Sequence, residues 1–282
     1  MTTFFAWTAP ASVVGAVADH TWVTSYDNRV QIFPDISSVE AAGEHFWYCW
    51  GIYRPKGSAP NNPSGYLGSQ KGGLSLARCL VSSNLDSMKH PAARGTIFRY
   101  GVDGVCHQLS NQVLFATGGV GSPLTVSRAR AYMLSVYVYG EYGRGRGNWA
   151  KAVAACAPGG GGGGGGGGLF GLQSANGGPD MEHMDEFARR AAEVLADDPR
   201  RLAALLQLRG EAQTLFVADP SFRQMTGASD LNARNSALLA EAARIVGAVN
   251  FERLFGYPPA GEPLLVDPAI VEAQRREDRG EP

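Results

Sequence analysis

The sequence has few cysteines, a modest share of charged residues and no long apolar run. Its four cysteines among 282 residues include no CxxC pair, which excludes a disulfide framework and disfavours structural zinc. No window reaches the roughly 18 consecutive apolar residues of a membrane span. Charged residues make up 18% of the chain, and apart from Arg144 and Arg146 the basic ones of the first half are scattered singly, so nucleic acid is not an expected partner. We expect a cytoplasmic globular protein.

A run of ten glycines, residues 159–168, separates two parts of different charge. The part before it has a charge balance of +5 and the part after it a balance of −6. Because ten consecutive glycines have no side chains to bury, the run should behave as a flexible tether. We predict an α+β domain over residues 1–158, a Gly-rich linker over 159–179, a helical bundle or lid over 180–258 and a polar tail over 259–282.

Strand signals are concentrated in the first part of the chain. Residues 20–25, 45–53 and 96–100 combine β-branched and aromatic side chains and are each followed by turn-forming residues, which predicts three short strands. Residues 56–73 are rich in Gly, Pro, Ser and Asn. This composition predicts a long surface loop.

Helical spacing appears after these strands. Val105, Leu109 and Val113 recur every four residues, which predicts a helix over residues 105–116. A second helix is predicted over 124–139, with a strand as the alternative for its Tyr-rich end.

The second part of the chain is predicted to be wholly helical. A first helix is expected after residue 180, a second begins at the Asp198-Pro199 pair, and a third runs from near Ser229 to Gly256.

Cys106 lies in the first turn of the helix predicted over 105–116, where unpaired N–H groups and the helix dipole favour a thiolate. The same N–H groups could stabilise an oxyanion. His107 is the next residue, but neighbours on a helix point about 100° apart, so it cannot easily act as the base. His20 and His45, each at the head of an aromatic strand, are better placed. The alternative is that Cys106 is a small buried hydrophobe and that both histidines are structural.

The order of these residues resembles a known superfamily. His20 opens the strand HTWVTS, further strands follow, and Val105-Cys106-His107 begins a helix. Over roughly residues 15–140 this order is similar to that of the circularly permuted papain-like cysteine enzymes, the lecithin:retinol acyltransferase-like group. The chain departs from that group at Val105, where Asn is usual, and at His107, which directly follows the cysteine.

The resemblance implies an α+β fold in which a small antiparallel sheet packs on the cysteine-bearing helix, so that residues 1–158 would be a papain-like catalytic domain. It implies Cys106 as nucleophile, His20 as general base and His45 as the residue that orients the imidazole. Tyr48, Asp27 and Asn28 are alternatives for this third role. Gln108 and Asn111 are candidate oxyanion donors, and Trp22 and Trp50 are candidate substrate contacts.

The expected reaction is acyl transfer through a Cys thioester, with hydrolysis of an amide or ester or transfer to an amine. The substrate would be a small molecule or a peptide, and no cofactor or metal is expected. An alternative is a non-enzymatic ligand-binding or assembly module whose C-terminal helices dock a protein partner. A weaker alternative is a metal site built from Cys106, His107, His20 and Cys49.

Overall fold

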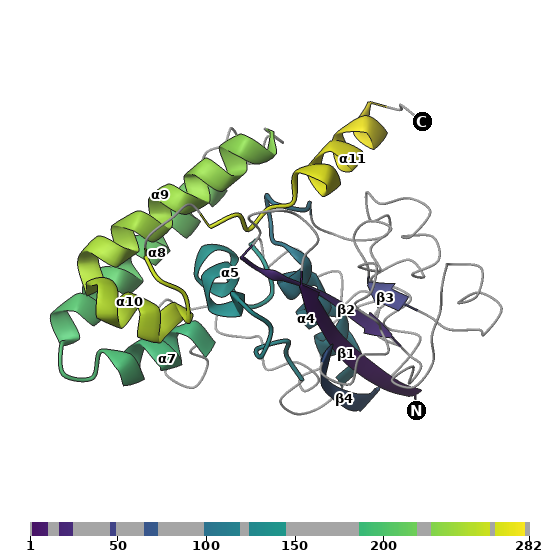
Figure 1. Ribbon diagram of the computed structural model, residues 1–282, viewed down its shortest axis with the longest axis horizontal. Coiled ribbons are helices and arrows are strands. Elements are labelled where there is room, and N and C mark those ends of the chain that lie inside the picture. The colour runs from purple at the N-terminus through teal and green to yellow at the C-terminus, as the bar shows by residue number, and fades with distance from the viewer. Residues whose placement is uncertain are drawn as a thin grey trace, which may run out of the picture.

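The protein has a mixed α+β fold, with a small sheet at one side and a group of helices at the other (Figure 1). This computed structural model describes residues 2–10, 17–24, 46–48, 65–72, 99–118, 124–144, 186–218, 227–259 and 263–279. Within these ranges, no helix combines the length and the apolar character that crossing a membrane requires. The predicted combination of an antiparallel sheet with helices is confirmed.

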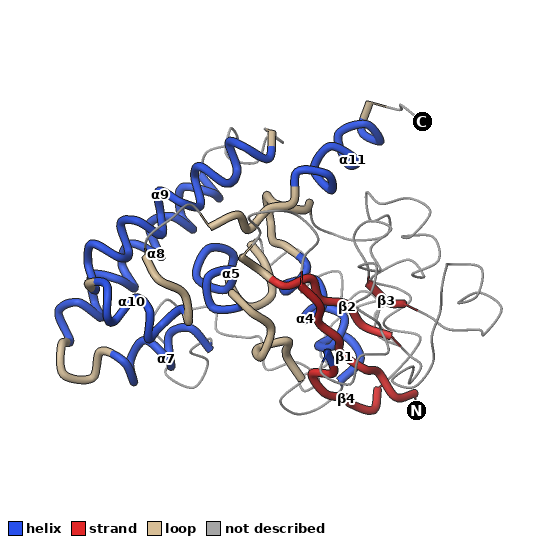
Figure 2. The backbone as a smooth tube through the Cα atoms, viewed as in Figure 1, coloured by secondary structure: helices blue, strands red, loops and turns tan. Residues whose placement is uncertain are grey.

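Four strands form the sheet, in the order β3-β2-β1-β4, and all neighbours are antiparallel. Figure 2 shows them gathered on one side of the molecule. β2 overlaps the strand predicted over 20–25 but begins one residue earlier, and β3 falls inside the strand predicted over 45–53. The strand bounds are β1 Thr2–Pro10, β2 Asp19–Thr24, β3 Phe46–Tyr48 and β4 Tyr66–Gly72.

β1 lies between β2 and β4 and is apolar on both faces. Phe4 and Ala6 enter the main hydrophobic core, whereas Trp7 and Ala9 join Trp22 in a second cluster. Successive side chains of a strand point to opposite faces, so each cluster takes alternate residues. A strand that is buried on both sides shows no polar alternation, which explains why the sequence pattern did not predict it.

One sequence prediction in this region is wrong, and another lies mostly outside the described residues. β4 occupies Tyr66–Gly72, inside the stretch predicted as a surface loop, because a strand with one exposed face tolerates its Gly, Ser and Lys. Of the strand predicted over 96–100, residues 96–98 lie outside the described part, and residues 99 and 100 form no strand. Tyr100 forms an isolated bridge to Gly104 instead, within a tight turn.

The helix α4, Cys106–Gly118, confirms the helix predicted over residues 105–116. It packs against β2, and Ser110 Oγ donates a hydrogen bond to Thr21 Oγ1 at 3.1 Å. The side chain of Gln108 reaches back to accept the N–H of Val105 at 3.1 Å. This is half of a capping box, which fixes where the helix begins.

The helix α5, Tyr132–Tyr139, is buried along nearly its whole length, and packs against α4 on one side and the C-terminal helices on another. It is a helix to its Tyr-rich end, so the alternative of a strand there is wrong. It also begins later than the predicted 124–139, because Ala131 adopts a left-handed conformation with φ of 59°. A helix that is apolar on all sides belongs inside a protein.

In the described part of the chain after the glycine run there are five further helices. α8 begins at Pro199, as the Asp198-Pro199 pair predicted, and the third predicted helix is divided into α9 and α10 at Gly247, whose φ is 80°. The prediction of a polar tail is wrong over α11, where Ile270 and Val271 are buried. The bounds are α7 Glu186–Val194, α8 Pro199–Ala218, α9 Ala228–Val246, α10 Ala248–Phe255 and α11 Pro268–Asp278.

Helix α8 supplies the side chains that cap the end of α5. Arg209 donates to the carbonyl oxygens of Val136 at 2.9 Å and Tyr137 at 3.1 Å, and Gln213 donates to that of Val138 at 2.9 Å. The last carbonyls of a helix have no partner within the helix. The C-terminal helices therefore complete the hydrogen bonding of α5, and both parts of the chain share one core.

Replacing Arg209 with Ala should lower the free energy of unfolding by about 2 kcal/mol, because it removes charge-assisted bonds to two part-buried carbonyls. Urea unfolding checks this. Gln207→Ala is the matched control, since Gln207 is exposed on the same helix and bonds only Glu211 among the contacts described. It should change stability by less than about 0.5 kcal/mol. Equal effects of the two variants would contradict the capping role.

Candidate functional site at the start of helix α4

Cys106 is the first residue of α4 and is buried, with 7% of its surface exposed. The backbone N–H of Thr21, in β2, lies close enough to the thiol to lower its pKa. Thr21 directly follows His20. The sulfur therefore lies beside the strand that carries the predicted base.

The thiol of Cys106 is neutral at physiological pH. Burial raises its pKa to about 12, against the opposing effect of the N–H groups of Thr21 and of Cys106 itself. The negative charges of Asp267 and Asp19 raise it further. The prediction that the helix start holds a thiolate is therefore wrong, because removing the sulfur from water outweighs two backbone donors.

His20 is almost fully buried in β2, and its ring stacks on Trp22 with the centroids 5.7 Å apart. Burial lowers its pKa to about 4, so its imidazole is neutral at pH 7. Trp22, predicted as a substrate contact, is 2% exposed and packs with Trp7 in the second cluster. Trp22 is therefore part of the wall around His20, without an exposed face for a substrate.

His107 is fully buried on α4 and faces α5. Its Nδ1 lies 2.8 Å from Ser135 Oγ, and its ring is tilted against that of Tyr132. Burial lowers the pKa of His107 to about 3, with the backbone of Asp19 acting in the opposite direction and the charge of His20 lowering it further. His107 is thus a second neutral histidine, directly after Cys106 in the sequence.

Gln108 does not have a free amide for an oxyanion. Its Nε2 donates to Ser135 Oγ and to the carbonyl of Gly140, both at 3.1 Å, while its Oε1 accepts the N–H of Val105. Both amide hydrogens and the oxygen are used. The prediction of an oxyanion donor is wrong for this residue.

Asn111 is occupied in the same way. Its Nδ2 donates to Tyr132 Oη and to the carbonyl of Glu141, each at 2.9 Å, and its Oδ1 accepts the N–H of Val126 at 2.9 Å. These bonds fasten α4 to the segments before and after α5. Asn111 is therefore a structural residue, and the prediction of an oxyanion donor is wrong for it too.

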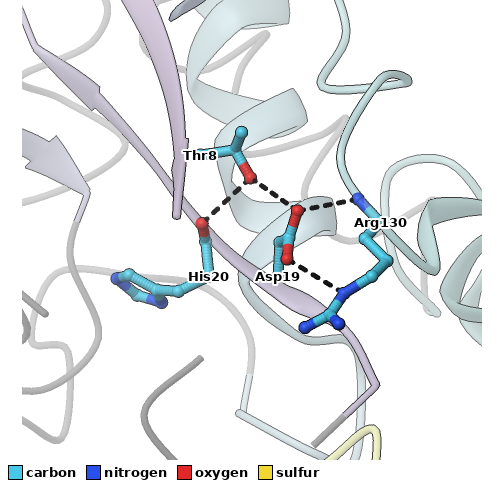
Figure 3. Close-up of polar contacts among 4 residues, drawn as sticks. All are labelled: Thr8, Asp19, His20 and Arg130. Atoms are coloured by element: carbon cyan, nitrogen blue, oxygen red, sulfur yellow. Dashed lines mark hydrogen bonds and ion pairs between the residues drawn. The ribbon is translucent and has the colours of Figure 1, made fainter. Parts of the chain in front are cut away.

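Asp19 is a residue that the sequence analysis missed. Its carboxylate accepts hydrogen bonds from Thr8 Oγ1 at 3.3 Å, from the backbone N–H of Arg130 at 3.0 Å and from Arg130 Nε at 3.2 Å. Figure 3 shows the side chains of Asp19 and His20 leaving β2 in different directions, with Asp19 directed toward Arg130. The sequence feature that could have pointed to Asp19 is its position directly before the histidine that opens a predicted strand. Nothing in the sequence connects Asp19 to Arg130.

The segment before α11 holds the loop that leads into Cys106. The N–H of Asp267 donates to Tyr100 Oη at 3.1 Å, and Gly101, with a φ of 76°, lies so close to Val266 that a Cβ would come within 2.7 Å of it. Only glycine fits this left-handed, crowded position. The C-terminal part of the chain therefore positions the loop from which α4 starts.

Several predicted site residues lie outside the described part of the structure: His45, Trp50, Asp27, Asn28 and Cys49. Tyr48 is in β3, where only the backbone is described. Among the described residues, no three His, Cys, Asp or Glu side chains are arranged to hold a metal ion. The alternative of a metal site at Cys106, His107 and His20 thus gains no support from this part of the chain.

Comparisons with known proteins do not assign the site. No family model, curated protein or solved structure matches the chain. Its function has to be inferred from the residues around Cys106.

The two buried histidines should make the protein less stable in acid. Their pKa values are lower in the folded state than in the unfolded state. Their contribution to the free energy of unfolding is therefore fully present above the unfolded pKa near 6.5 and is lost as the pH falls toward 3 to 4. His107→Gln, which keeps a polar group near Ser135, should reduce the slope of stability against pH between 6 and 4 by up to about 1.4 kcal/mol per pH unit. Urea unfolding across this range measures the slope, and an unchanged slope would contradict the prediction.

Folded Cys106 should react slowly with iodoacetamide at pH 7, and its rate should rise about tenfold per pH unit up to pH 11, since only the thiolate reacts. In urea the alkylation rate of the same residue should stop rising above the ordinary thiol pKa of about 8.5. Peptide mass spectrometry distinguishes it from Cys49, Cys79 and Cys156. Fast labelling of the folded protein at pH 6 to 7 would contradict the burial of the sulfur.

Proposed function

We propose that the protein is a thiol-dependent acyl-transfer enzyme, with Cys106 as the nucleophile and His20 as the general base. The observation that supports this most is that the backbone N–H of Thr21, one residue along β2 from His20, lies near enough to the Cys106 thiol to lower its pKa. Helix α4 also packs against the strand that carries the histidine, and Ser110 Oγ donates to Thr21 Oγ1 at 3.1 Å. The substrate class is an ester or amide of a small molecule or peptide.

Both proposed catalytic groups are neutral at pH 7. The pKa of Cys106 is raised to about 12 and that of His20 is lowered to about 4, both by burial, so at pH 7 the thiol holds its proton and the imidazole can accept one. A thiolate is then formed only as the sulfur attacks. General base catalysis requires a neutral base, but it is most efficient when the pKa of the base lies near the operating pH, so the low pKa of His20 opposes the proton transfer in the free protein.

The proposed reaction has two steps. The sulfur of Cys106 bonds to the acyl carbon while His20 takes the thiol proton; the bond to the leaving alcohol or amine then breaks, and His20 returns the proton to that group. Water or an amine next attacks the thioester with His20 as base, and the thiol is regenerated. The first N–H groups of α4, which have no acceptor within the helix, are the proposed donors to the oxyanion in place of Gln108 and Asn111.

The second candidate function is a non-enzymatic binding or assembly module. The burial of both Cys106 and His20 favours it, since a buried thiol is also an ordinary core residue. In the described part of the C-terminal region, Leu215 and Val249 are exposed large apolar side chains to which a partner could dock. In this case Cys106→Ala would retain the protein's function.

Incubation with p-nitrophenyl acetate should attach one acetyl group to Cys106 as a thioester that hydroxylamine removes. Intact mass and peptide mapping detect it. Cys106→Ala should abolish the adduct, whereas the matched control Cys156→Ala should retain it. His20→Phe, which keeps a ring against Trp22 but removes the base, should slow acylation by about 100-fold or more. Acetylation that persists in Cys106→Ala, or is unchanged in His20→Phe, would contradict the proposal.

A further inference from the structure

We propose that the C-terminal region, residues 186–279, is a binding partner in its own right: it recognises a surface formed by α5 and the loop before α4, and it stays bound there when the segment that connects the two parts is cut. In Figure 1, α5 lies between the sheet and the helices α7, α8, α9 and α10. All four of these helices contact α5. The proposal concerns how the chain is assembled and does not rest on the proposed function.

The connecting segment, residues 145–185, is much longer than the gap it closes. The N–H of Glu186, at the start of α7, donates to Glu141 Oε2 at 3.4 Å. On the other flank, the guanidinium of Arg144 lies 4.8 Å from the ring centroid of Phe216 in α8. Extended at about 3.3 Å per residue, a segment of about 40 residues could reach beyond about 100 Å. Its length therefore does not impose this close approach, and the contacts between the two parts have to.

Polar contacts direct the C-terminal region to the end of α5. Arg209 of α8 donates to the carbonyl oxygens of Val136 and Tyr137. Gln213, one turn further along α8, donates to that of Val138. Carbonyl groups in the last turn of a helix need partners from outside the helix. Two donors one turn apart match this row of consecutive carbonyls, so the bonds fix the direction and register of α8 on α5 as well as its distance.

Apolar contacts cover the side chain of Tyr137, which is fully buried. Its ring centroid lies 4.9 Å from that of Phe187 in α7 and 5.5 Å from that of Phe255 in α10. An aromatic side chain buries about 150–250 Å². Without the C-terminal region these rings would lose their cover, and contiguous apolar patches of a few hundred Å² mark interaction sites. The covered face of α5 is thus of the kind that holds a partner by itself.

A second group of contacts lies at the loop before α4. A Cβ at Gly101 would come within 2.7 Å of Val266, so the two parts are closely packed here. Tyr139 Oη, at the end of α5, connects this loop to α9, because it donates to the carbonyl of Gly101 at 3.0 Å and accepts from Asn235 at 2.8 Å. Contacts at two places on one surface give the C-terminal region a single orientation.

The test cuts the full chain within the glycine run. Residues 161–166 are replaced by a thrombin site of equal length, and the variant is digested to completion, with wild-type protein as the control for cutting elsewhere. The cut protein should elute from gel filtration as one complex with the mass of the uncut chain. Its Tm should fall on about tenfold dilution, because the parts are now separate molecules, whereas the Tm of the uncut variant should not. Separation or precipitation of the fragments at micromolar concentration would overturn the proposal.

Interface variants test whether the described contacts hold the complex. In the cut protein, Arg209→Ala should weaken the affinity between the two parts by about 10-fold to 100-fold, because charge-assisted bonds across the interface are lost. Gln207→Ala is the matched control, since Gln207 is exposed on the same helix and its described bond is to Glu211. Analytical ultracentrifugation of a dilution series measures both affinities. Equal affinities would overturn the proposed surface.

A deletion provides an independent measurement on the uncut chain. Removing residues 159–168 should change the Tm by less than about 2 °C, because the entropy of loop closure depends only weakly on loop length. Loss of folding, or a large fall in Tm, would show that assembly depends on the connecting segment and would overturn the proposal. None of these readouts is an enzymatic activity, so the result is independent of whether Cys106 is a nucleophile.

Discussion

Burial of polar groups is the constraint on which the structure depends. The sheet, α4, α5 and the C-terminal helices share one hydrophobic core, so the polar side chains of α4 that point inward need protein partners, and among these side chains only Nε2 of His107 is buried without one in the described part of the structure. Gln108, Asn111 and Gln112 meet this requirement by donating to the consecutive carbonyls of residues 140, 141 and 142. The face of α4 that could have bound a substrate is used to hold the chain that leaves α5.

The same burial determines the chemistry of the thiol. A helix start favours an anion, but that effect is modest and is strongest where water is also present. At Cys106 the loss of water raises the pKa of the thiol, and at His20 it lowers the pKa of the imidazole. Both groups are therefore neutral at pH 7, and the proposed reaction has to couple proton transfer to the attack on the substrate.

Residue spacing and capping residues in the sequence predicted the helices whose position depends on neighbouring residues alone. The four-residue spacing predicted α4, and the aspartate and proline at 198 and 199 predicted where α8 begins. The sequence pattern did not predict β1, because both faces of this strand are buried. It did not predict α11 either, because the short apolar face of this helix is surrounded by charged residues. For the site, Cys106 and the strand of His20 could be predicted from sequence. The pairing of Asp19 with Arg130 could not, since 111 positions separate them and no spacing rule applies.

The C-terminal region is part of the same structural unit as the site. Tyr139 Oη donates to the carbonyl of Gly101 and accepts from Asn235 in α9, while Asn232 holds the backbone of Val266. These bonds tie the loop before Cys106 to helices that follow the glycine run. A lid that opens freely would have to break them and expose the apolar surface of α5. The geometry instead favours a region that stabilises the start of α4, so the position of the thiol depends on residues more than 100 positions away in sequence.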